Sequence, residues 1–441
     1  MSDLLVDRLL TEFEPSPERR AAFLQVLSSR STAANAIRRQ AILRDFLTDR
    51  ELLDDLREML TGYDDLRRNW QELRLSLGVY ASLKATADFV RSTVSYFKSV
   101  HDSLAEHIPE SDGLRELQKW LLETSRNDSL DELNRIAELF PLDSPEAYEI
   151  EARVQFADDF AVKLASITTI AEIVETPFIR RVFRKKIDDG SVDLGEFHAD
   201  QSRALLRESM YELYRAMTAT AGALYEVFHG ISRELDFYTT ATLLCDYLHG
   251  KGMHFTFPRF SDRIHAAGIF DPLLLAEGLT SAQIVANSSD FPALRGVLIR
   301  GENAAGKTSF IRAIGLLSIF ASAGLPVCAQ TAEVPYFGYV HSQFSKAEQL
   351  GKLDEAGRFE QEVAELAGIY AHIGKAELLL LNETFQTTSY AEGAEAIRHI
   401  LSAIERRGAS WIFVTHLSPL LQDPPPEAEL ITMEDYSYGN K

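Results

Sequence analysis

Apolar residues follow a helical period through roughly the first half of the chain. They recur every three or four positions over 52–73 and again over 206–235, as on one face of an amphipathic helix. A bend is expected near Gly62, and the stretches HIPESDG and FPLDSPEAY interrupt the helices with Pro, Gly and Ser. We therefore predict an all-α domain over residues 1–255, made of core and lever helices.

The pattern changes after Pro258, where short continuous apolar runs alternate with helical patterns. Helices are expected from Thr308 and from about Ala391. The apolar runs are GVLIR (296–300), ELLLL (377–381) and WIFVT (411–415). Apolar strands separated by helices are typical of a mostly parallel sheet that is covered on both faces. We predict an α/β domain over 256–441, with the edge of its sheet near the three prolines at 424–426.

Composition narrows the classes of function. The formal net charge is −21, whereas nucleic-acid binders usually carry a basic surplus, so such a role here requires a local basic patch. No apolar run reaches the roughly 18 residues that indicate a membrane helix, and the chain does not begin like a signal peptide. Cys245 and Cys328 are far apart in apolar contexts, so neither a disulfide nor a metal site is predicted and a reducing cytoplasm is expected.

The strongest motif is GENAAGKT at 301–308, which has the full G-x-x-x-x-G-K-[ST] pattern of a phosphate-binding loop (Walker A). Glycines let the backbone curl around phosphates at a helix N-terminus, Lys307 would reach the β- and γ-phosphates, and the Thr308 hydroxyl would join a Mg²⁺ shell. We predict that ATP and Mg²⁺ bind here; the alternative is a chance glycine-rich turn. The expected contacts are Gly301, Glu302, Asn303, Ala304, Ala305, Gly306, Lys307, Thr308 and Ser309.

The run LLLLNE at 378–383 predicts the second strand of such a site. Glu383 is the candidate for orienting the attacking water. Asn382 and Glu383 lie on the metal side, where Asn382 replaces the usual aspartate, so weaker Mg²⁺ affinity and a slow ATPase are expected. His416, after the third strand, could hydrogen-bond the γ-phosphate. The alternatives are a buried strand whose end caps the next helix and a histidine that is merely a satisfied polar residue.

These three motifs, in this order and spacing, resemble the MutS family of ABC-type ATPases, which act in DNA repair. The segment GRFEQEVAELAGIY (357–370) looks like the S-T-F-x-x-E-x-x-E signature, with Phe359, Glu362 and Glu365 in step. NETFQTTSYAEGAEA stands where the family has D-E-I-G-R-G-T-S, and FVTHL is similar to its A-T-H strand end. The resemblance is specific in 290–420 and looser before about 250, where helical core and lever segments are similar.

The resemblance implies a homodimer in which each ATP lies between one subunit's phosphate loop and the partner's signature segment. ATP binding would close the ATPase domains and move the lever helices, which grip DNA in family members. Here Gly357 and Arg358 replace the signature serine and threonine. Gly357 could offer a backbone N–H, and Arg358 could reach the partner's γ-phosphate. Ile284 aligns with the aromatic residue that stacks on adenine, so nucleotide selectivity is expected to be loose.

Other departures shape the expected substrate. Helical core sequence begins almost at once, without the family's mismatch-reading domain, so branched or recombining DNA is expected rather than mismatches. The chain ends soon after the His416 strand, without the family's C-terminal dimerising helices, as in a short member or in part of a longer protein. No membrane partner is expected.

A basic run in RRVFRKKIDDGSVDLGEF is the candidate DNA contact. It contains Arg180, Arg181, Arg184, Lys185 and Lys186. These cations could neutralise several phosphates. The alternative is a solvated face balanced by nearby aspartates, and the dipeptide Asp189-Gly190 is a hairpin turn signal.

Two functions therefore stay open. The first is a DNA-directed ATPase that switches a dimeric helical clamp. The second is a nucleotide-gated dimeric scaffold that binds a protein partner, with little hydrolysis and no DNA. A clamp of the chromosome-maintenance type is disfavoured, because the helices lack the long heptads that its arms require.

Overall fold

The computed structural model describes most of the chain. The chain forms two compact units, and each unit is made of segments that are separate in the sequence. Tertiary contacts divide it into one unit of Met1–Thr48, Glu110–Gly113 and Arg233–Lys441, and another of Asp49–Pro109 and Leu114–Ser232. The described residues are 2–76, 79–125, 148–156, 162–172, 195–292, 296–302, 305–345, 355–385, 390–426 and 428–433.

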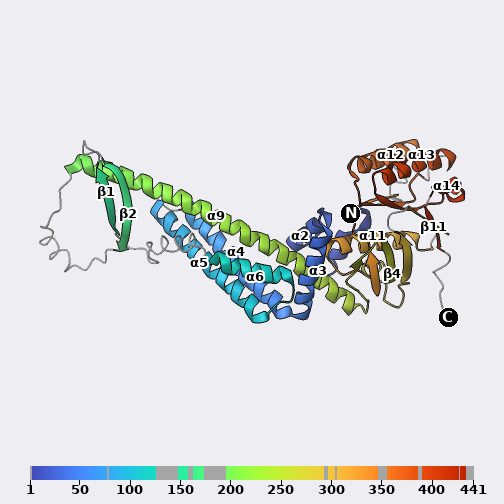
Figure 1. The fold of residues 1–441 in the computed structure, drawn as a ribbon, viewed down its shortest axis with the longest axis horizontal. Helices are drawn as coiled ribbons and strands as arrows, with labels where there is room; N and C mark the ends of the chain where they lie inside the picture. The colour runs from blue at the N-terminus through green and yellow to red at the C-terminus, as the bar shows by residue number, and fades with distance from the viewer. Residues whose placement is uncertain are drawn as a thin grey trace. The chain divides into compact units, whose positions relative to one another are not determined.

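The second unit is built mainly from long helices. Its principal elements are α4 (Arg50–Ser76), α5 (Val79–His107), α6 (Asp112–Ser125) and the larger part of α9 (Gly195–Gly250), which run alongside one another (Figure 1). Aromatic rings join them: Tyr63 of α4 stacks on Phe228 of α9 at 4.2 Å between centroids, and Trp70 stacks on Phe89 of α5 at 4.5 Å. The helical period over 52–73 is confirmed, and α4 continues through Gly62 as a single helix.

The prediction that residues 1–255 are all helical is wrong in one place. β1 (Tyr148–Phe156) and β2 (Val162–Glu172) form an antiparallel two-stranded sheet within the second unit. In β1 the apolar residues alternate with charged or polar ones, which is the period of a strand, and β2 is rich in β-branched residues. The turn expected at Asp189 and Gly190 and the basic run at 180–186 lie outside the described residues.

The first unit joins both ends of the chain. Its N-terminal elements are η1 (Ser2–Leu4), α1 (Val6–Leu10), α2 (Pro17–Ser28) and α3 (Ala33–Thr48). The carboxylate of Glu14 is fully buried and binds Arg19 at 2.8 Å and the Thr240 hydroxyl of α9 at 2.9 Å. This division differs from the single boundary expected near residue 255, because the first helices and the end of α9 belong with the C-terminal part.

A four-stranded sheet precedes and flanks the phosphate loop in this unit. Its order is β3-β7-β4-β5, and β4 pairs antiparallel with both β5 and β7. The strands are β3 (Arg259–Phe260), β4 (Arg263–Ile269), β5 (Asn287–Pro292) and β7 (Thr331–Val334), with the short helix α10 (Leu273–Ala276) between β4 and β5. The sequence did not predict this sheet. Cys245 and Cys328 are both buried.

A five-stranded sheet carries the strands predicted from the three apolar runs. Its order is β11-β6-β10-β9-β8, and every neighbouring pair is parallel. The strands are β6 (Val297–Gly301), β8 (Val340–Phe344), β9 (Leu378–Asn382), β10 (Ser410–Val414) and β11 (Glu429–Met433). The expected parallel sheet is confirmed, and β11, which follows the three prolines, is an edge strand.

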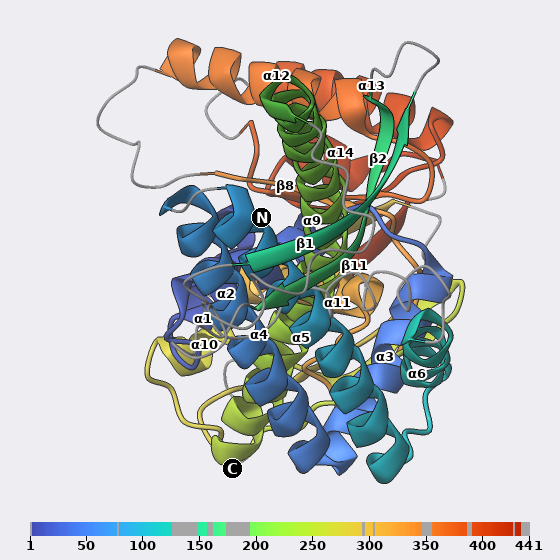
Figure 2. The same ribbon diagram turned by 90° about the vertical axis from the view of Figure 1, so that its left-hand side faces the viewer.

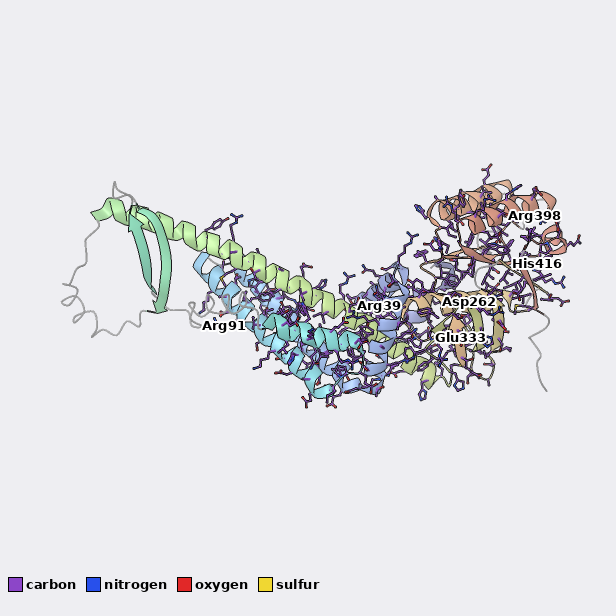
Figure 3. The ribbon with its side chains drawn as sticks, viewed as in Figure 1. Arg39, Arg91, Asp262, Glu333, Arg398 and His416 are labelled. Carbon is purple, nitrogen blue, oxygen red and sulfur yellow. The ribbon has the colours of Figure 1, made fainter. Side chains whose placement is uncertain are left out.

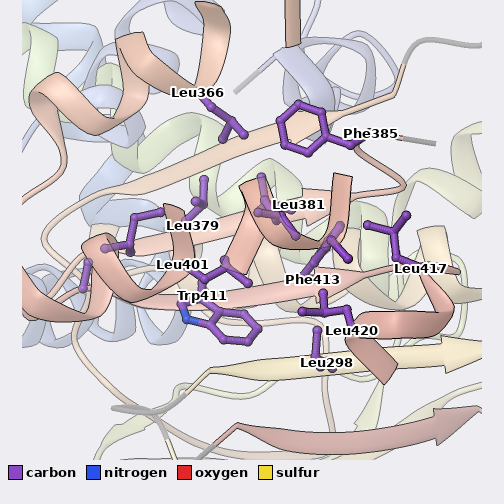
Figure 4. Packing of buried hydrophobic residues seen from close by; sticks show 14 of the residues in the cluster. Leu298, Leu366, Leu379, Leu381, Phe385, Leu401, Trp411, Phe413, Leu417 and Leu420 are labelled. Atoms are coloured by element: carbon purple, nitrogen blue, oxygen red, sulfur yellow. The ribbon is translucent and has the colours of Figure 1, made fainter. Parts of the chain in front are cut away.

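Helices cover both faces of the parallel sheet. The helices are α11 (Lys307–Ala323), α12 (Glu355–His372), α13 (Tyr390–Arg406) and α14 (Ser418–Gln422). Figures 1 and 2 show α12 and α13 together above the sheet. Leu379 and Leu381 of β9 share a buried core with residues of α12 and α13 such as Leu366 and Leu401 (Figure 4). Leu380 points to the opposite face, toward Gly315 of α11.

The leucine run is therefore buried from both sides, as a central parallel strand requires. Within the described parts of the chain, no helix combines the length and the apolar composition needed to cross a bilayer.

Candidate nucleotide-binding site

The carboxyl ends of three adjacent strands meet at one edge of the parallel sheet. Val414 of β10 pairs with Ile299 of β6 on one side and with Asn382 of β9 on the other. The residues that follow these strands, including Glu383 and His416, therefore emerge side by side. Ligands of open α/β sheets bind in the crevice outside the carboxyl ends of the strands, so the topology alone points to this edge.

The loop between β6 and α11 contains two glycines, and each position requires glycine for a different reason. Gly306 caps α11 with φ of +80°, in the left-handed region that favours glycine. A β-carbon at Gly301 would lie 2.7 Å from the carbonyl oxygen of Met433 in the neighbouring strand β11. Glu302 is exposed, Ala305 is buried and Ser309 lies in the first turn of α11, whereas Asn303 and Ala304 lie outside the described residues. The N–H groups of that first turn form the positive end of the helix dipole.

Lys307 is folded back onto its own loop. Its Nζ donates to the carbonyl oxygens of Gly301 at 3.0 Å and Glu302 at 2.8 Å, and the residue is only 5% exposed. The ammonium group is thus held at the loop rather than in solvent. A phosphate oxygen is a stronger acceptor than these neutral carbonyls, so a bound phosphate would compete for the same hydrogens.

Asn382 links the acidic strand to the loop. Its Nδ2 donates to Thr308 Oγ1 at 3.4 Å. Its Oδ1 is buried and has no hydrogen-bond partner among the described residues, and the same holds for Thr384 Oγ1. Buried polar atoms without a protein partner are uncommon and call for an explanation such as water or an ion. An amide oxygen beside a hydroxyl is a donor set that fits Mg²⁺ or its coordinated water.

Glu383 and His416 face each other across the strand ends. Glu383 Oε1 lies 3.5 Å from His416 Nε2, within ion-pair distance but without hydrogen-bond geometry, and both side chains are about one-third exposed. His416 comes two residues after the end of β10 and is labelled in Figure 3. Glu383 has φ of +56°, and its N–H donates to the carbonyl of Val414 at 2.8 Å. The structure thus brings together Lys307, Thr308, Asn382, Glu383 and His416 around one strand edge.

The sequence that forms this site matches a known family of domains. Residues 297–434 match the family model described as MutS domain V, a span that contains the loop, both strand ends and α12. Proteins named MutS and MutS2 also align with parts of this chain. The C-terminal region of the chain therefore belongs to the MutS family. The match to the family model covers the C-terminal region.

Three relatives show how similar the sequences are and how much of each chain aligns. The endonuclease MutS2 of Anaeromyxobacter sp. (strain Fw109-5) is 30% identical over 240 residues, 51% of this chain and 28% of that protein. The DNA mismatch repair protein MutS of Granulibacter bethesdensis is 34% identical over 163 residues, 35% of this chain and 17% of that protein. The protein of the same name from Thermus thermophilus is 28% identical over 218 residues, 48% and 25% respectively. The chain spans less than a third of the length of these relatives.

The remaining predicted residues of the MutS-like site are placed separately. Gly357 and Arg358 lie in the first turn of α12. Ile284 comes just before β5 and is 9% exposed, whereas its neighbour Val285 is 50% exposed. Ile284 therefore offers little surface on which a base could stack. The proposed DNA contacts at 180–186 lie outside the described residues.

Sequence reasoning missed Gln343 of β8. This residue is 4% exposed, and its Nε2 donates to the carbonyl of Glu362 at 3.0 Å and to Glu365 Oε2 at 3.3 Å. A single glutamine in the run VHSQF gives no signal in the sequence. It also lines a groove of about 790 Å³ beside β8 and α12, which contains none of the loop residues.

A second charged cluster lies at the opposite end of the strands. The carboxylate of Glu377, just before β9, binds His341 and Arg30 at 2.8 Å each. Burial opposes ionisation of Glu377, but hydrogen bonds from His341 and the Gly374 N–H, together with Arg30, hold the pKa of its carboxyl below the usual value. One strand length separates this cluster from the phosphate loop, so we assign it a structural role. Its ion pairs connect Arg30, between α2 and α3, with the parallel sheet.

Proposed function

We propose that this MutS-family chain is an ATPase that uses ATP binding and slow hydrolysis to switch a dimeric helical clamp on DNA. The observation that carries the proposal is the meeting of the acidic strand with the phosphate loop, where Asn382 contacts Thr308 and leaves a buried oxygen without a protein partner among the described residues. That oxygen and the adjacent hydroxyl suit a hydrated Mg²⁺ that accompanies a nucleotide.

Each residue has a distinct role in this proposal. The first-turn N–H groups of α11 bind phosphate oxygens, and Lys307 exchanges its loop carbonyls for the same phosphates. The Thr308 hydroxyl and Asn382 Oδ1 hold Mg²⁺ or its water. When bound, Mg²⁺ offsets the negative charge of the phosphates. Glu383 orients the attacking water and accepts its proton, and His416 donates to the γ-phosphate.

The uncharged Asn382 makes the site a slow one. A carboxylate at this position would add a negative charge next to the metal, whereas the amide contributes only a dipole. Among the described residues, no group of three or more His, Cys, Asp or Glu side chains is arranged to hold a metal. Metal binding here therefore depends on the nucleotide phosphates, and hydrolysis is limited by how well the metal is held.

DNA is the proposed partner because relatives carry the names endonuclease MutS2 and DNA mismatch repair protein MutS. The long helices α4, α5 and α9 would act as the arms of the clamp, and the basic run at 180–186 would contact the backbone phosphates. In the homodimer, Gly357 and Arg358 would face the partner's ATP. Branched or recombining DNA is the proposed substrate class.

Two observations favour a second function. The uncharged metal-side residue Asn382, together with the net charge of −21, suits a protein that binds ATP, dimerises and recruits a protein partner with little turnover and no DNA.

A single set of measurements separates the two. ATPase rate and oligomeric state are measured with and without duplex, single-stranded and branched DNA at low salt. The DNA-directed ATPase predicts turnover that DNA stimulates and that Glu383→Gln abolishes. ATP-driven dimerisation without turnover would support the scaffold. If no DNA binds in the presence of ATP or a non-hydrolysable analogue, the clamp proposal fails.

A further inference from the structure

Glu383 and Phe385, which follow β9, both adopt a backbone conformation that residues with side chains rarely take. Glu383 has φ of +56° and Phe385 has φ of +66°. Neither is glycine, asparagine or aspartate, the residues that tolerate the left-handed region best. Such conformations persist only where the surroundings hold them, and they concentrate at functional sites. The turn at 383–385 therefore needs an external support.

Three contacts supply that support. The Glu383 N–H donates to the carbonyl of Val414 at 2.8 Å, which fixes the start of the turn. The Phe385 N–H donates to Glu362 Oε2 of α12 at 2.7 Å, which fixes its end. The Phe385 ring is fully buried, with Leu366 of α12 facing it (Figure 4). Of these contacts, the charged acceptor Glu362 forms the strongest class of hydrogen bond.

Glu362 is itself held in place from β8. The Gln343 amide donates to the backbone carbonyl of Glu362 and to the carboxylate of Glu365, one helical turn further along α12. Gln361 donates to the same Glu365 carboxylate at 3.0 Å. One network therefore connects β8, α12 and the turn that carries Glu383.

We propose that Glu362 is a positioning residue for hydrolysis: its carboxylate fixes the turn at 383–385 and thereby the direction of the Glu383 carboxylate. Glu383 is two residues from the amide that Glu362 holds, so a displacement of α12 moves this amide and rotates the backbone of Glu383. The inference rests on the proposed ATPase function. It adds a route by which the position of α12, whose first turn carries Gly357 and Arg358, controls turnover at the subunit's own site.

The test compares Glu362→Ala and Glu362→Gln with the matched control Glu360→Ala, an exposed residue of the same helix. Glu362→Ala is expected to lower kcat roughly tenfold or more, with the KM for ATP changed by less than about threefold, because an interaction that orients a catalytic group acts after binding. Glu362→Gln retains an acceptor oxygen and is expected to keep an intermediate kcat. Glu360→Ala should match the wild type.

A double-mutant cycle shows whether Glu362 acts through Glu383. In single-turnover measurements, Glu362→Ala should reduce the residual rate of Glu383→Gln by less than about twofold, since residues that act as a unit are non-additive. Additive losses would overturn the proposal, as would an unchanged kcat in Glu362→Ala. A wild type without any turnover would instead overturn the proposed function, and this inference with it.

Amide exchange gives a readout that does not depend on turnover. The Phe385 N–H should exchange faster in Glu362→Ala than in Glu360→Ala, with Glu362→Gln between them. Equal exchange in all three variants would show that the carboxylate does not hold the turn. If Glu362→Ala fails to fold, the Glu362→Gln variant supports the proposal when kcat and protection fall together and overturns it when both are unchanged.

Discussion

Asn382 Nδ2 lies 3.4 Å from Thr308 Oγ1, so the acidic strand and the phosphate loop meet through an uncharged pair of side chains. In this contact the hydroxyl oxygen accepts from the amide, which leaves the amide oxygen buried and free of protein partners among the described residues. The contact fixes where a metal and its waters would have to fit. The charge of residue 382 should therefore directly affect how tightly Mg²⁺ binds there.

Replacing Asn382 by aspartate should tighten the dependence on Mg²⁺. The added carboxylate is a preferred ligand of Mg²⁺, so the concentration for half-maximal turnover should fall roughly tenfold. The measurement is an ATPase titration with Mg²⁺, with Asn382→Ala as the control that removes the amide oxygen. An unchanged titration in Asn382→Asp would place residue 382 outside the metal shell.

Replacing Lys307 by alanine should weaken nucleotide binding without unfolding the protein. The ammonium group contacts the loop itself, so its loss removes charge from the phosphate site without opening the core. A charge-assisted hydrogen bond contributes about 1.5–3 kcal/mol, which corresponds to a loss of roughly tenfold to a hundredfold in affinity. Calorimetric titration with ATP and Mg²⁺ measures this loss. The exposed Lys375 provides the control, and equal affinities in both alanine variants would contradict the assignment.

Replacing Glu383 by glutamine should separate binding from hydrolysis. Glutamine keeps the shape of the side chain but cannot accept a proton, so the affinity for ATP should persist while kcat falls by roughly 10²–10⁴. Equilibrium binding and steady-state turnover are compared with Glu395→Gln, an exposed glutamate of α13. Full turnover in Glu383→Gln would mean that another group orients the water.

His107 should make the stability of the second unit depend on pH. Its Nδ1 lies 2.7 Å from Asp49 Oδ2 and its Nε2 lies 3.3 Å from Asp55 Oδ2. Hydrogen bonding to Asp49, and then to Asp55, raises the pKa of the histidine above 6.5, against a smaller opposing effect of burial. The charged imidazolium therefore stabilises the fold fully below the unfolded pKa of 6.5, and this contribution is lost as the pH rises through the higher folded pKa.

Thermal unfolding between about pH 6 and about pH 8.5 measures this dependence, since a histidine titrates in that range. His107→Gln is the control, because it keeps polar contacts without a titrating group. The wild type should lose stability relative to this variant as the pH rises. The same slope in both proteins would assign the pH dependence to other groups.

Replacing two helical glycines by alanine should change the free energy of unfolding in opposite directions. A β-carbon at Gly315 of α11 would lie 2.6 Å from Leu380 Cδ1 and 2.8 Å from Leu4 Cδ2, and both leucines are fully buried. Gly315→Ala should therefore lower the free energy of unfolding by about 1–2 kcal/mol through overpacking. At Gly368 of α12 an added β-carbon meets nothing within 4 Å, so Gly368→Ala should raise it by about 0.5–1 kcal/mol. Denaturant unfolding of both variants tests the pair, and a stabilising Gly315→Ala would contradict the packing described here.

The parallel sheet could be predicted because its signals are local. Strands buried on both faces are continuous apolar runs, and the loop motif fixes which strand leads into which helix. The leucines at 379, 380 and 381 illustrate this: alternate residues meet opposite helix layers, so none of them needs to be polar.

Other features depend on contacts that the local pattern does not encode. The hydroxyl of Thr240 binds Glu14 across 226 residues of sequence, and no periodicity shows that the first helices join the C-terminal unit. The short strands of the four-stranded sheet, two to seven residues long, leave a weak alternation. Within the site, Gln343 and the support that Glu362 gives to the turn were invisible, because one hydrogen bond to a backbone N–H leaves no pattern in the sequence.

The left-handed backbone at Phe385 constrains how this family member can diverge. Glycine would accept the conformation freely but would leave the space of a buried ring empty, whereas a β-branched residue would fill part of that space in a conformation it resists. Neither exchange is neutral alone. Positions 362 and 385 should therefore covary among sequences that share the strand end Asn382-Glu383, with the glutamate at 362 retained where residue 385 carries a side chain and free to change where residue 385 is glycine.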